Sequence, residues 1–243
     1  MPEFSLNDVD PSFLEGRPII FEGIGVVGGE AACQAVGFGA PYVILCDYDS
    51  VKPHNVVGPR KQVYRDGDIG HPKVEALAEI LKGINPSLRI ETRLRKIEAP
   101  EIYSGETERF VFCAFDEYDG RVHVRDSCFQ SPDVALLIEQ RLAPDAGHVF
   151  VLEPQNPYHQ HRYSHPDNWK RPPPPQPGEE ECGQTRTNML LAKVSATLMM
   201  RSLWTWLLQE RGSSAPVAND ISFWLQPALQ SNEKVWREEV PKT

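Results

Sequence analysis

The sequence predicts an α/β fold built around a doubly wound, mostly parallel sheet. Short apolar runs of strand length alternate with stretches of helical spacing through the first half of the chain. That order places helices on both faces of a parallel sheet. A GxGxxG sequence at 23–28 joins the first apolar run to the first helical stretch. At 243 residues, a single domain over 1–243 is favoured over two independent domains.

Local patterns justify each element of the first half. The run at 17–23 is apolar and ends in glycine, and the segment 28–40 is rich in small residues, as a closely packed helix would be. The segment 71–86 has helical spacing. One face of it carries Val74, Leu77, Ile80, Leu81 and Ile84. Further strands are expected at 41–49, 87–94 and 109–116. This β-α-β-α-β-β order is typical of a Rossmann-like sheet.

The second half predicts additions to this sheet. Residues 134–154 look like two strands joined by a turn near 144–147, which indicates an appended antiparallel hairpin. Residues 155–186 are expected to form a mobile crossover loop, because much of the segment is polar and proline-rich. The longest apolar helix is expected at 187–209, buried against the sheet or another subunit. A last strand is expected at 221–229.

Composition narrows the class of protein. The net charge of −9 argues against a broad nucleic-acid footprint, so a nucleic-acid partner is not expected. No apolar run is long enough to span a bilayer, and we expect no membrane partner. The cysteines are widely spaced and form no CxxC pair, which argues against a disulfide framework and against a four-cysteine zinc site. A reducing cytoplasm fits this usage best.

The GxGxxG sequence indicates a nucleotide site. Gly23 permits a tight turn, Gly25 lets the backbone approach a phosphate, and Gly28 lets the helix pack close to the sheet. Asp47 ends the next strand, near the usual distance of about 20 residues for an acid that binds a ribose. These residues alone would also suit an NAD-dependent dehydrogenase, or a glycine-rich turn that binds nothing.

The residues after Asp47 favour a triphosphate. Asn55, Arg60 and Lys73 follow on a loop and a helix start, and several donors and positive charges suit a triphosphate better than a dinucleotide. Asp116 is expected to end the fourth strand, at the edge where ligands bind such sheets. A carboxylate there could hold Mg²⁺ against the phosphates.

Four segments together resemble the ThiF/MoeB/ubiquitin-activating family of adenylating enzymes. The glycine turn with the DYDSV strand end resembles the family's glycine loop and D-x-D-x-V motif. The run NVVGPRKQ is similar to its N-L-x-R-Q phosphate-binding run. DIGHPKVEALAEILKGINP resembles the D-x-G-x-x-K helix that ends in I-N-P, and VFCAFDEYDGRVHVRDSC resembles the segment with the magnesium-linked aspartate. The resemblance covers residues 19–128.

The resemblance implies a role for each matching residue. Asp47 would contact the ribose, and Asp49 would shape the loop. Asp116 would coordinate Mg²⁺ and orient the attacking carboxylate. The phosphate-binding residues would be Asn55, Arg60 and Lys73, with Gln62 as a weaker match.

A cysteine nucleophile is a separate question. Family members that form a thioester place a cysteine after a crossover loop and before a long helix, and Cys182 occupies that place. The acids at 179–181 would raise the pKa of its thiol, whereas Arg186 and a helix N-terminus would lower it. Both a catalytic Cys182 and an unreactive loop cysteine stay open.

The sequence also departs from the family pattern. No arginine precedes Arg17, which puts an arginine finger from this chain in doubt and points to a partner subunit as its source. The two CxxC pairs of many members are absent, so no structural zinc site is expected. The spacing between Asn55 and Arg60 is longer than usual for the family.

The resemblance implies ATP-dependent adenylation of a carboxylate. The expected substrate is the Gly-Gly C-terminus of a ubiquitin-like or sulfur-carrier protein, with Mg²⁺ as cofactor and a homodimer or heterodimer as the assembly. The alternatives are a small-molecule, peptide or tRNA-linked carboxylate, a non-catalytic heterodimer subunit, and an NAD-dependent dehydrogenase.

Overall fold

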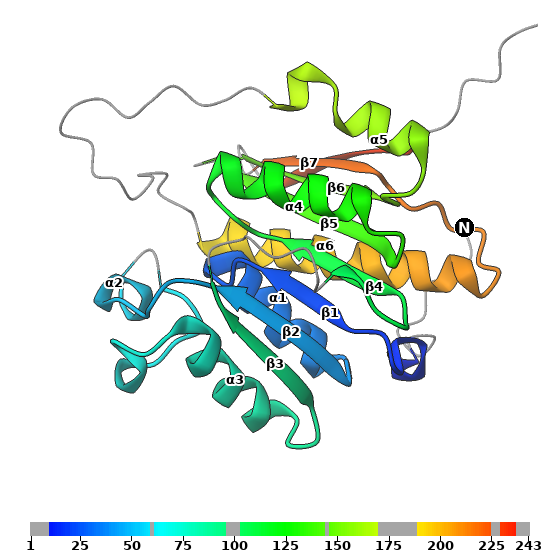
Figure 1. Ribbon diagram of the computed structural model, residues 1–243. Coiled ribbons are helices and arrows are strands. Elements are labelled where there is room, and N and C mark those ends of the chain that lie inside the picture. Colours follow the sequence, from blue (N-terminus) through cyan, green and yellow to red (C-terminus); the bar gives the residue numbers. More distant parts are fainter. Residues whose placement is uncertain are drawn as a thin grey trace, which may run out of the picture.

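The computed structural model describes residues 10–58, 61–95, 103–143, 146–169, 189–224 and 229–236. These residues form one sheet with the strand order β3-β2-β1-β4-β5-β6-β7-β8 (Figure 1). The parallel strands are β1 (Ile19–Glu22), β2 (Tyr42–Asp47), β3 (Arg89–Leu94), β4 (Arg109–Cys113) and β5 (Val134–Leu142). The antiparallel strands are β6 (Ala146–Leu152), β7 (Asp220–Trp224) and β8 (Gln230–Lys234). The predicted doubly wound, mostly parallel sheet is confirmed.

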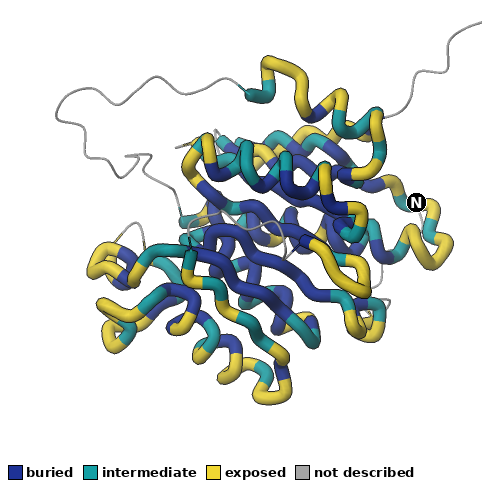
Figure 2. The backbone as a smooth tube through the Cα atoms, viewed as in Figure 1, coloured by how far each residue is buried: buried dark blue, intermediate teal, exposed yellow. Residues whose placement is uncertain are grey.

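Helices cover both faces of the sheet. One face packs on α1 (Val26–Gly37), α3 (Lys73–Ile84) and α6 (Met189–Glu210). The other packs on α4 (Tyr118–Gln130) and α5 (Pro157–Tyr163). Short helical segments lie at η2 (Pro11–Leu14), α2 (Pro53–Val56), η3 (Asp66–Asp68) and η5 (Pro166–Trp169). Figure 2 shows the central strands as a buried layer between these helices.

Burial on both faces explains the unbroken apolar runs. In β1 every residue is buried: Ile19 and Phe21 face α1 and α6, whereas Ile20 faces α4. Phe21 pairs in register with Phe112 of β4, and their ring centroids lie 5.1 Å apart. A parallel strand buried in this way has no solvent face and needs no polar alternation.

The crossover segment differs from its prediction as a loop. Within 155–186 the structure has α5 and η5, and residues 170–186 lie outside the described part of the chain. The carboxamide oxygen of Asn156 accepts hydrogen bonds from the N–H groups of Tyr158 and His159, at 2.9 and 3.3 Å, and Pro157 begins the helix. An N-cap asparagine followed by proline is a helix start signal that composition concealed.

Two further expectations need correction. The hairpin of β5 and β6 is confirmed, but the antiparallel part continues through β7, the strand expected at 221–229, into β8. All residues of β8 are exposed, so the strand has no apolar alternation to reveal it. Ile84 is 46% exposed at the end of α3, although it was expected on the apolar face.

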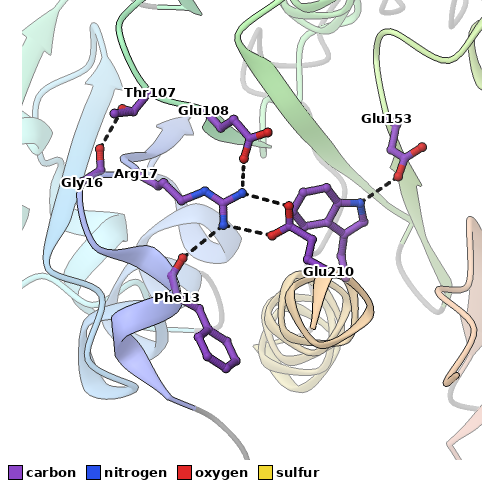
Figure 3. Close-up of polar contacts among 8 residues, drawn as sticks. Phe13, Gly16, Arg17, Thr107, Glu108, Glu153 and Glu210 are labelled. Atoms are coloured by element: carbon purple, nitrogen blue, oxygen red, sulfur yellow. Dashed lines mark hydrogen bonds and ion pairs between the residues drawn. The ribbon is translucent and has the colours of Figure 1, made fainter. Parts of the chain in front are cut away.

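Arg17 fastens the C-terminal end of α6 to the sheet (Figure 3). Its guanidinium donates to the carbonyl oxygen of Phe13, at 3.2 Å, and to the carboxylates of Glu108 and Glu210. The same group lies 5.8 Å from the ring of Trp206, whose Nε1 donates to Glu153 at 2.9 Å. Arg17 precedes β1, at the opposite edge of the sheet from the glycine turn, and is paired within the chain.

Arg17→Met is expected to lower the free energy of unfolding by about 2 kcal/mol, because it leaves two carboxylates without their guanidinium beside a partly buried site. Arg201→Met on the same helix is the control, since the Arg201 side chain is 53% exposed whereas that of Arg17 is 18% exposed. That control should cost less than about 1 kcal/mol. Urea denaturation measures both, and equal losses would contradict the assignment.

Candidate nucleotide site

The glycine turn is built by two close contacts. Gly23 has φ +81° and its N–H donates to the carbonyl oxygen of Cys46 at 2.9 Å. A Cβ at Gly23 would lie 3.1 Å from the backbone of Ala114. A Cβ at Gly28 would lie 1.9 Å from the carbonyl oxygen of Gly23. Only glycine at both positions lets α1 begin directly against the turn.

Gly25 has a different environment from the other two glycines. Its φ of −69° is not the positive value that favours glycine. A Cβ built there would meet nothing within 4 Å among the described residues. A side chain at Gly25 would therefore project into the open space at the N-terminus of α1. Backbone N–H groups at such a terminus bind anions, so this opening fits a phosphate.

Asp47 joins the end of β2 to the glycine turn. Its carboxylate is buried and accepts hydrogen bonds from the N–H of Ile24, at 2.9 Å, and from the N–H of Asp49, at 2.8 Å. Burial raises the pKa of Asp47, while the positive charge of Lys73 and the two backbone donors act against that rise. Each carboxylate oxygen has a second lone pair. Asp47 therefore fixes the turn and can still accept from a ligand hydroxyl.

Lys73 lies at the first turn of α3, beside both acids. Its Nζ is 2.9 Å from Oδ2 of Asp49, and its backbone N–H donates to the carbonyl oxygen of Asp49 at 2.9 Å. The side chain is 8% exposed, so the ammonium is positioned by its contact with Asp49 and has little contact with solvent. An ammonium has three donors, and the pair with Asp49 leaves others for phosphate oxygens. The structure thus brings Asp47, Asp49 and Lys73 together, and their roles in nucleotide binding stay predictions.

Asn55 and Gln62 lie on the loop between β2 and α3. The side-chain oxygen of Asn55 accepts from the N–H of Lys52 at 2.8 Å and so caps α2. The backbone carbonyl oxygen of Asn55 accepts a hydrogen bond from the backbone N–H of Gln62 at 2.6 Å. The buried Oε1 of Gln62 has no partner among the residues that the structure describes. An unpaired buried acceptor fits a ligand hydroxyl. Arg60 lies outside the described residues.

Asp116 lies beyond the end of its strand, which corrects the expectation that it ends β4. The strand stops at Cys113, and Asp116 is exposed on the loop before α4. The next residue, Glu117, accepts a hydrogen bond of 2.8 Å from the hydroxyl of Tyr48. Burial raises the pKa of Tyr48, and this hydrogen bond adds to the rise. The contact joins the loops after β2 and β4, the two strands that flank β1. The sequence analysis did not identify Tyr48 or Glu117.

Glu22 is a buried acid directly before the glycine turn. It is 2% exposed, and the hydroxyl of Tyr103 donates to it at 2.7 Å. Burial raises the pKa of Glu22 from 4.5 to about 7, although the hydrogen bond from Tyr103 acts in the opposite direction. The sequence offered one signal, a charged residue at the end of an otherwise apolar strand. Glu22 faces α4, and the negative charge of Asp47 contributes to the rise in its pKa.

The described residues fit a magnesium nucleotide at the carboxyl ends of β1, β2 and β4. Mg²⁺ is commonly held by one or two carboxylates together with substrate phosphates, and the exposed Asp116 suits that mode. Within the described ranges, no group of three His, Cys, Asp or Glu side chains gathers for a metal, and no helix is long and apolar enough to cross a bilayer. Cys182, the candidate nucleophile, lies outside these ranges.

The chain belongs to the ThiF family, whose sequence profile matches residues 14–235. The SAMP-activating enzyme E1 of Haloferax volcanii is 28% identical over 113 residues, which cover 45% of this chain and 40% of that protein. Ubiquitin-like modifier-activating enzyme 5 of Oryza sativa is 26% identical over 152 residues, which cover 56% of this chain and 35% of that protein. The chain therefore matches less than half of either relative. The predicted family is confirmed.

Solved structures share the fold. PaaA superposes with a TM-score of 0.68 and 16% sequence identity over 93% of this chain and 74% of that chain. Escherichia coli MccB solved with ATP has a TM-score of 0.69 and 14% identity over 95% of this chain and 67% of that chain. At these identities the likeness concerns the backbone and not the site residues.

Gly28→Ala and Gly25→Ala form a matched pair of substitutions. Gly28→Ala should lower the free energy of unfolding by at least about 3 kcal/mol, because its Cβ would overlap a backbone oxygen. Gly25→Ala should cost about 1 kcal/mol, the ordinary loss at a helix N-cap, yet weaken ATP binding at least about tenfold. Thermal unfolding and titration calorimetry test this. Normal ATP affinity in Gly25→Ala would contradict the placement of a phosphate at the glycine turn.

Glu22 should make stability depend on pH. The folded state holds the Glu22 proton more tightly than the unfolded state, so this contribution is complete below pH 4.5 and falls by up to about 3 kcal/mol as pH rises to about 7. Glu22→Gln stays neutral and should lack this loss. Urea denaturation from about pH 5 to about pH 8 compares the two, with the exposed Glu79→Gln as control. Parallel curves for wild type and Glu22→Gln would contradict the assignment.

Proposed function

We propose that the protein is an ATP-dependent adenylyltransferase that activates the C-terminal carboxylate of a ubiquitin-like or sulfur-carrier protein. The observation that carries the proposal is the common edge of β1, β2 and β4. There the open backbone at Gly25, the buried Asp47 and the exposed Asp116 lie at or beyond the ends of neighbouring strands. The buried Lys73 lies near Asp47 at the start of α3. Membership of the ThiF family supports ATP as the substrate.

Each residue then has a role in holding the reactants. Gly25 and Lys73 bind phosphates, together with Asn55 and Arg60. Asp47 and the unpaired oxygen of Gln62 accept from ribose hydroxyls. Asp116 binds Mg²⁺, which neutralises phosphate charge, and orients the attacking carboxylate.

The reaction is a displacement at the α-phosphorus. An oxygen of the substrate carboxylate forms a bond with that phosphorus, and the bond to the pyrophosphate oxygen breaks. The products are an acyl-adenylate and pyrophosphate. If Cys182 acts, its thiolate attacks the acyl carbon and AMP departs, which leaves a thioester. The four described cysteines are poor alternatives, because burial raises the pKa of each thiol: Cys33, Cys46, Cys113 and Cys128.

The relatives support a protein substrate. Their names describe the activation of SAMP and of ubiquitin-like modifiers, whereas MccB was solved with MccA. A peptide, a small molecule or a tRNA-linked carboxylate is the alternative substrate. We also propose a dimer, in which a partner supplies an arginine, and a cytoplasmic location. A dehydrogenase is disfavoured, because the buried ammonium of Lys73 beside the ribose-binding acid suits additional phosphate.

Exchange of pyrophosphate into ATP, with candidate carriers that end in Gly-Gly, tests the proposal. Asp116→Ala should lower the exchange rate at least about 100-fold, through loss of the metal carboxylate. Glu79→Ala, which removes an exposed acid from α3, should leave the rate unchanged. Cys182→Ala should retain exchange, because exchange precedes thioester formation. Full exchange in Asp116→Ala, or tight NAD(H) binding without ATP binding, would contradict the proposal.

A further inference from the structure

Three arginines surround a buried acid on β5, the strand next to β4 in the sheet. The carboxyl ends of β1, β2 and β4 are called the nucleotide edge. We refer to Arg121, Arg125 and Arg141 as the arginine cluster. Glu139 of β5 is 1% exposed and accepts a hydrogen bond from Nε of Arg141. Burial raises the pKa of Glu139, and the positive charges of all three arginines act against the rise. The guanidinium groups of two α4 residues and one β5 residue are thus gathered around a single carboxylate.

Part of the arginine cluster is already paired within the described ranges. Nε and Nη2 of Arg125 each lie 2.7 Å from Oδ1 of Asp126, and Nη1 of Arg141 donates to the carbonyl oxygen of Asn168. Among the described residues, the buried Nε of Arg121 and the buried Nη2 of Arg141 have no hydrogen-bond partner. Both atoms are donors. Unpaired donors on charged groups are costly to bury, so this site is suited to an added acceptor with negative charge.

Aromatic side chains hold these guanidinium groups in place. The guanidinium carbon of Arg125 lies 4.3 Å from the ring centroid of Trp169, and that of Arg141 lies 4.7 Å from it. Trp169 is itself fixed, since its indole Nε1 donates to the carbonyl oxygen of Tyr163 at 2.7 Å and the hydroxyl of Tyr118 donates to the backbone carbonyl oxygen of Trp169 at 3.0 Å. These ring contacts fix two guanidinium groups of the cluster, and one of them, that of Arg141, has the Nη2 that is unpaired among the described residues.

Sheet register sets the distance from the cluster to the glycine turn. Glu139 pairs with Cys113 of β4, and Cys113 pairs with Glu22 of β1. Two strand spacings therefore separate Glu139 from the residue before the turn, about 10 Å. An extended polypeptide covers that distance in about three residues. Asp116 lies three residues beyond Cys113, on the loop that follows the intervening strand β4.

We propose that the arginine cluster binds an acidic side chain of the substrate, third or fourth from the carboxylate that is activated. This inference rests on the proposed adenylation and narrows its substrate to a polypeptide tail with an acidic residue near its end. The reacting carboxylate itself suits the cluster poorly. Several guanidinium donors would stabilise its ground state and weaken it as a nucleophile, whereas an anchoring acid can be held tightly without that penalty.

Synthetic hexapeptides that end in Gly-Gly test this inference. Each peptide of the series carries one glutamate, placed at the third, fourth, fifth or sixth position from the C-terminus. A matching peptide has glutamine at the same position. Titration calorimetry with the full chain and a non-hydrolysable ATP analogue measures Kd. Glutamate at the third or fourth position should tighten binding at least about tenfold over glutamine, and glutamate at the sixth should not.

Variants of the protein test whether the arginine cluster causes the preference for glutamate. Arg125→Gln removes a guanidinium that does not hydrogen-bond Glu139, and it should reduce the glutamate preference to less than about threefold. The double change Arg141→Gln with Glu139→Gln keeps the local charge balance and should do the same. Arg162→Gln, on the exposed surface of α5, is the control and should keep the preference.

Different results would contradict the acidic-residue subsite and the proposed adenylation. Equal affinity for the paired peptides, absence of binding by all of them, or a preference that survives Arg125→Gln overturns the subsite while pyrophosphate exchange with a carrier persists. Loss of ATP binding and of exchange with every carrier overturns adenylation itself. Circular dichroism of each variant confirms that it folds.

Discussion

The buried carboxylate of Asp47 is the constraint on which the nucleotide edge depends. It accepts backbone hydrogen bonds from Ile24 in the glycine turn and from Asp49 after β2. Asp49 in turn pairs with Lys73, which begins α3. One side chain therefore connects the turn, the second strand and the helix that supplies a cation. The backbone donors oppose the rise in pKa that burial causes, and they fix the position of the carboxylate before a ligand arrives.

The charges of the edge are arranged by strand. Acids end β1 and β2, the loop after β4 carries Asp116, and guanidinium groups gather at β5. A triphosphate beside a carboxylate substrate brings together two like charges, and neighbouring cations and Mg²⁺ reduce that repulsion. Lys73 lies on one side of the glycine turn and Arg121, Arg125 and Arg141 lie on the other. Under the proposed function, these cations would lie on both sides of a triphosphate bound at the turn.

Sequence patterns predicted the parallel half of the fold because its strands are buried on both faces and its turn requires glycine. They also single out Asp47, Asn55 and Lys73 as candidate nucleotide-binding residues, and that role stays a prediction. They missed β8 because an exposed edge strand has no periodic pattern, and α5 because polar, proline-rich composition resembled a loop. Tyr48 and Glu117 were missed for another reason: their contact joins two strand ends, and only the sheet order brings those ends together.

The most direct measurement is a crystal structure of the protein grown with a non-hydrolysable ATP analogue and Mg²⁺. The account predicts that the phosphates lie against Gly25 and Lys73, that a ribose hydroxyl contacts Asp47, and that the metal is bound by Asp116. An edge that stays empty at saturating nucleotide, or a nucleotide bound elsewhere on the chain, would contradict the account.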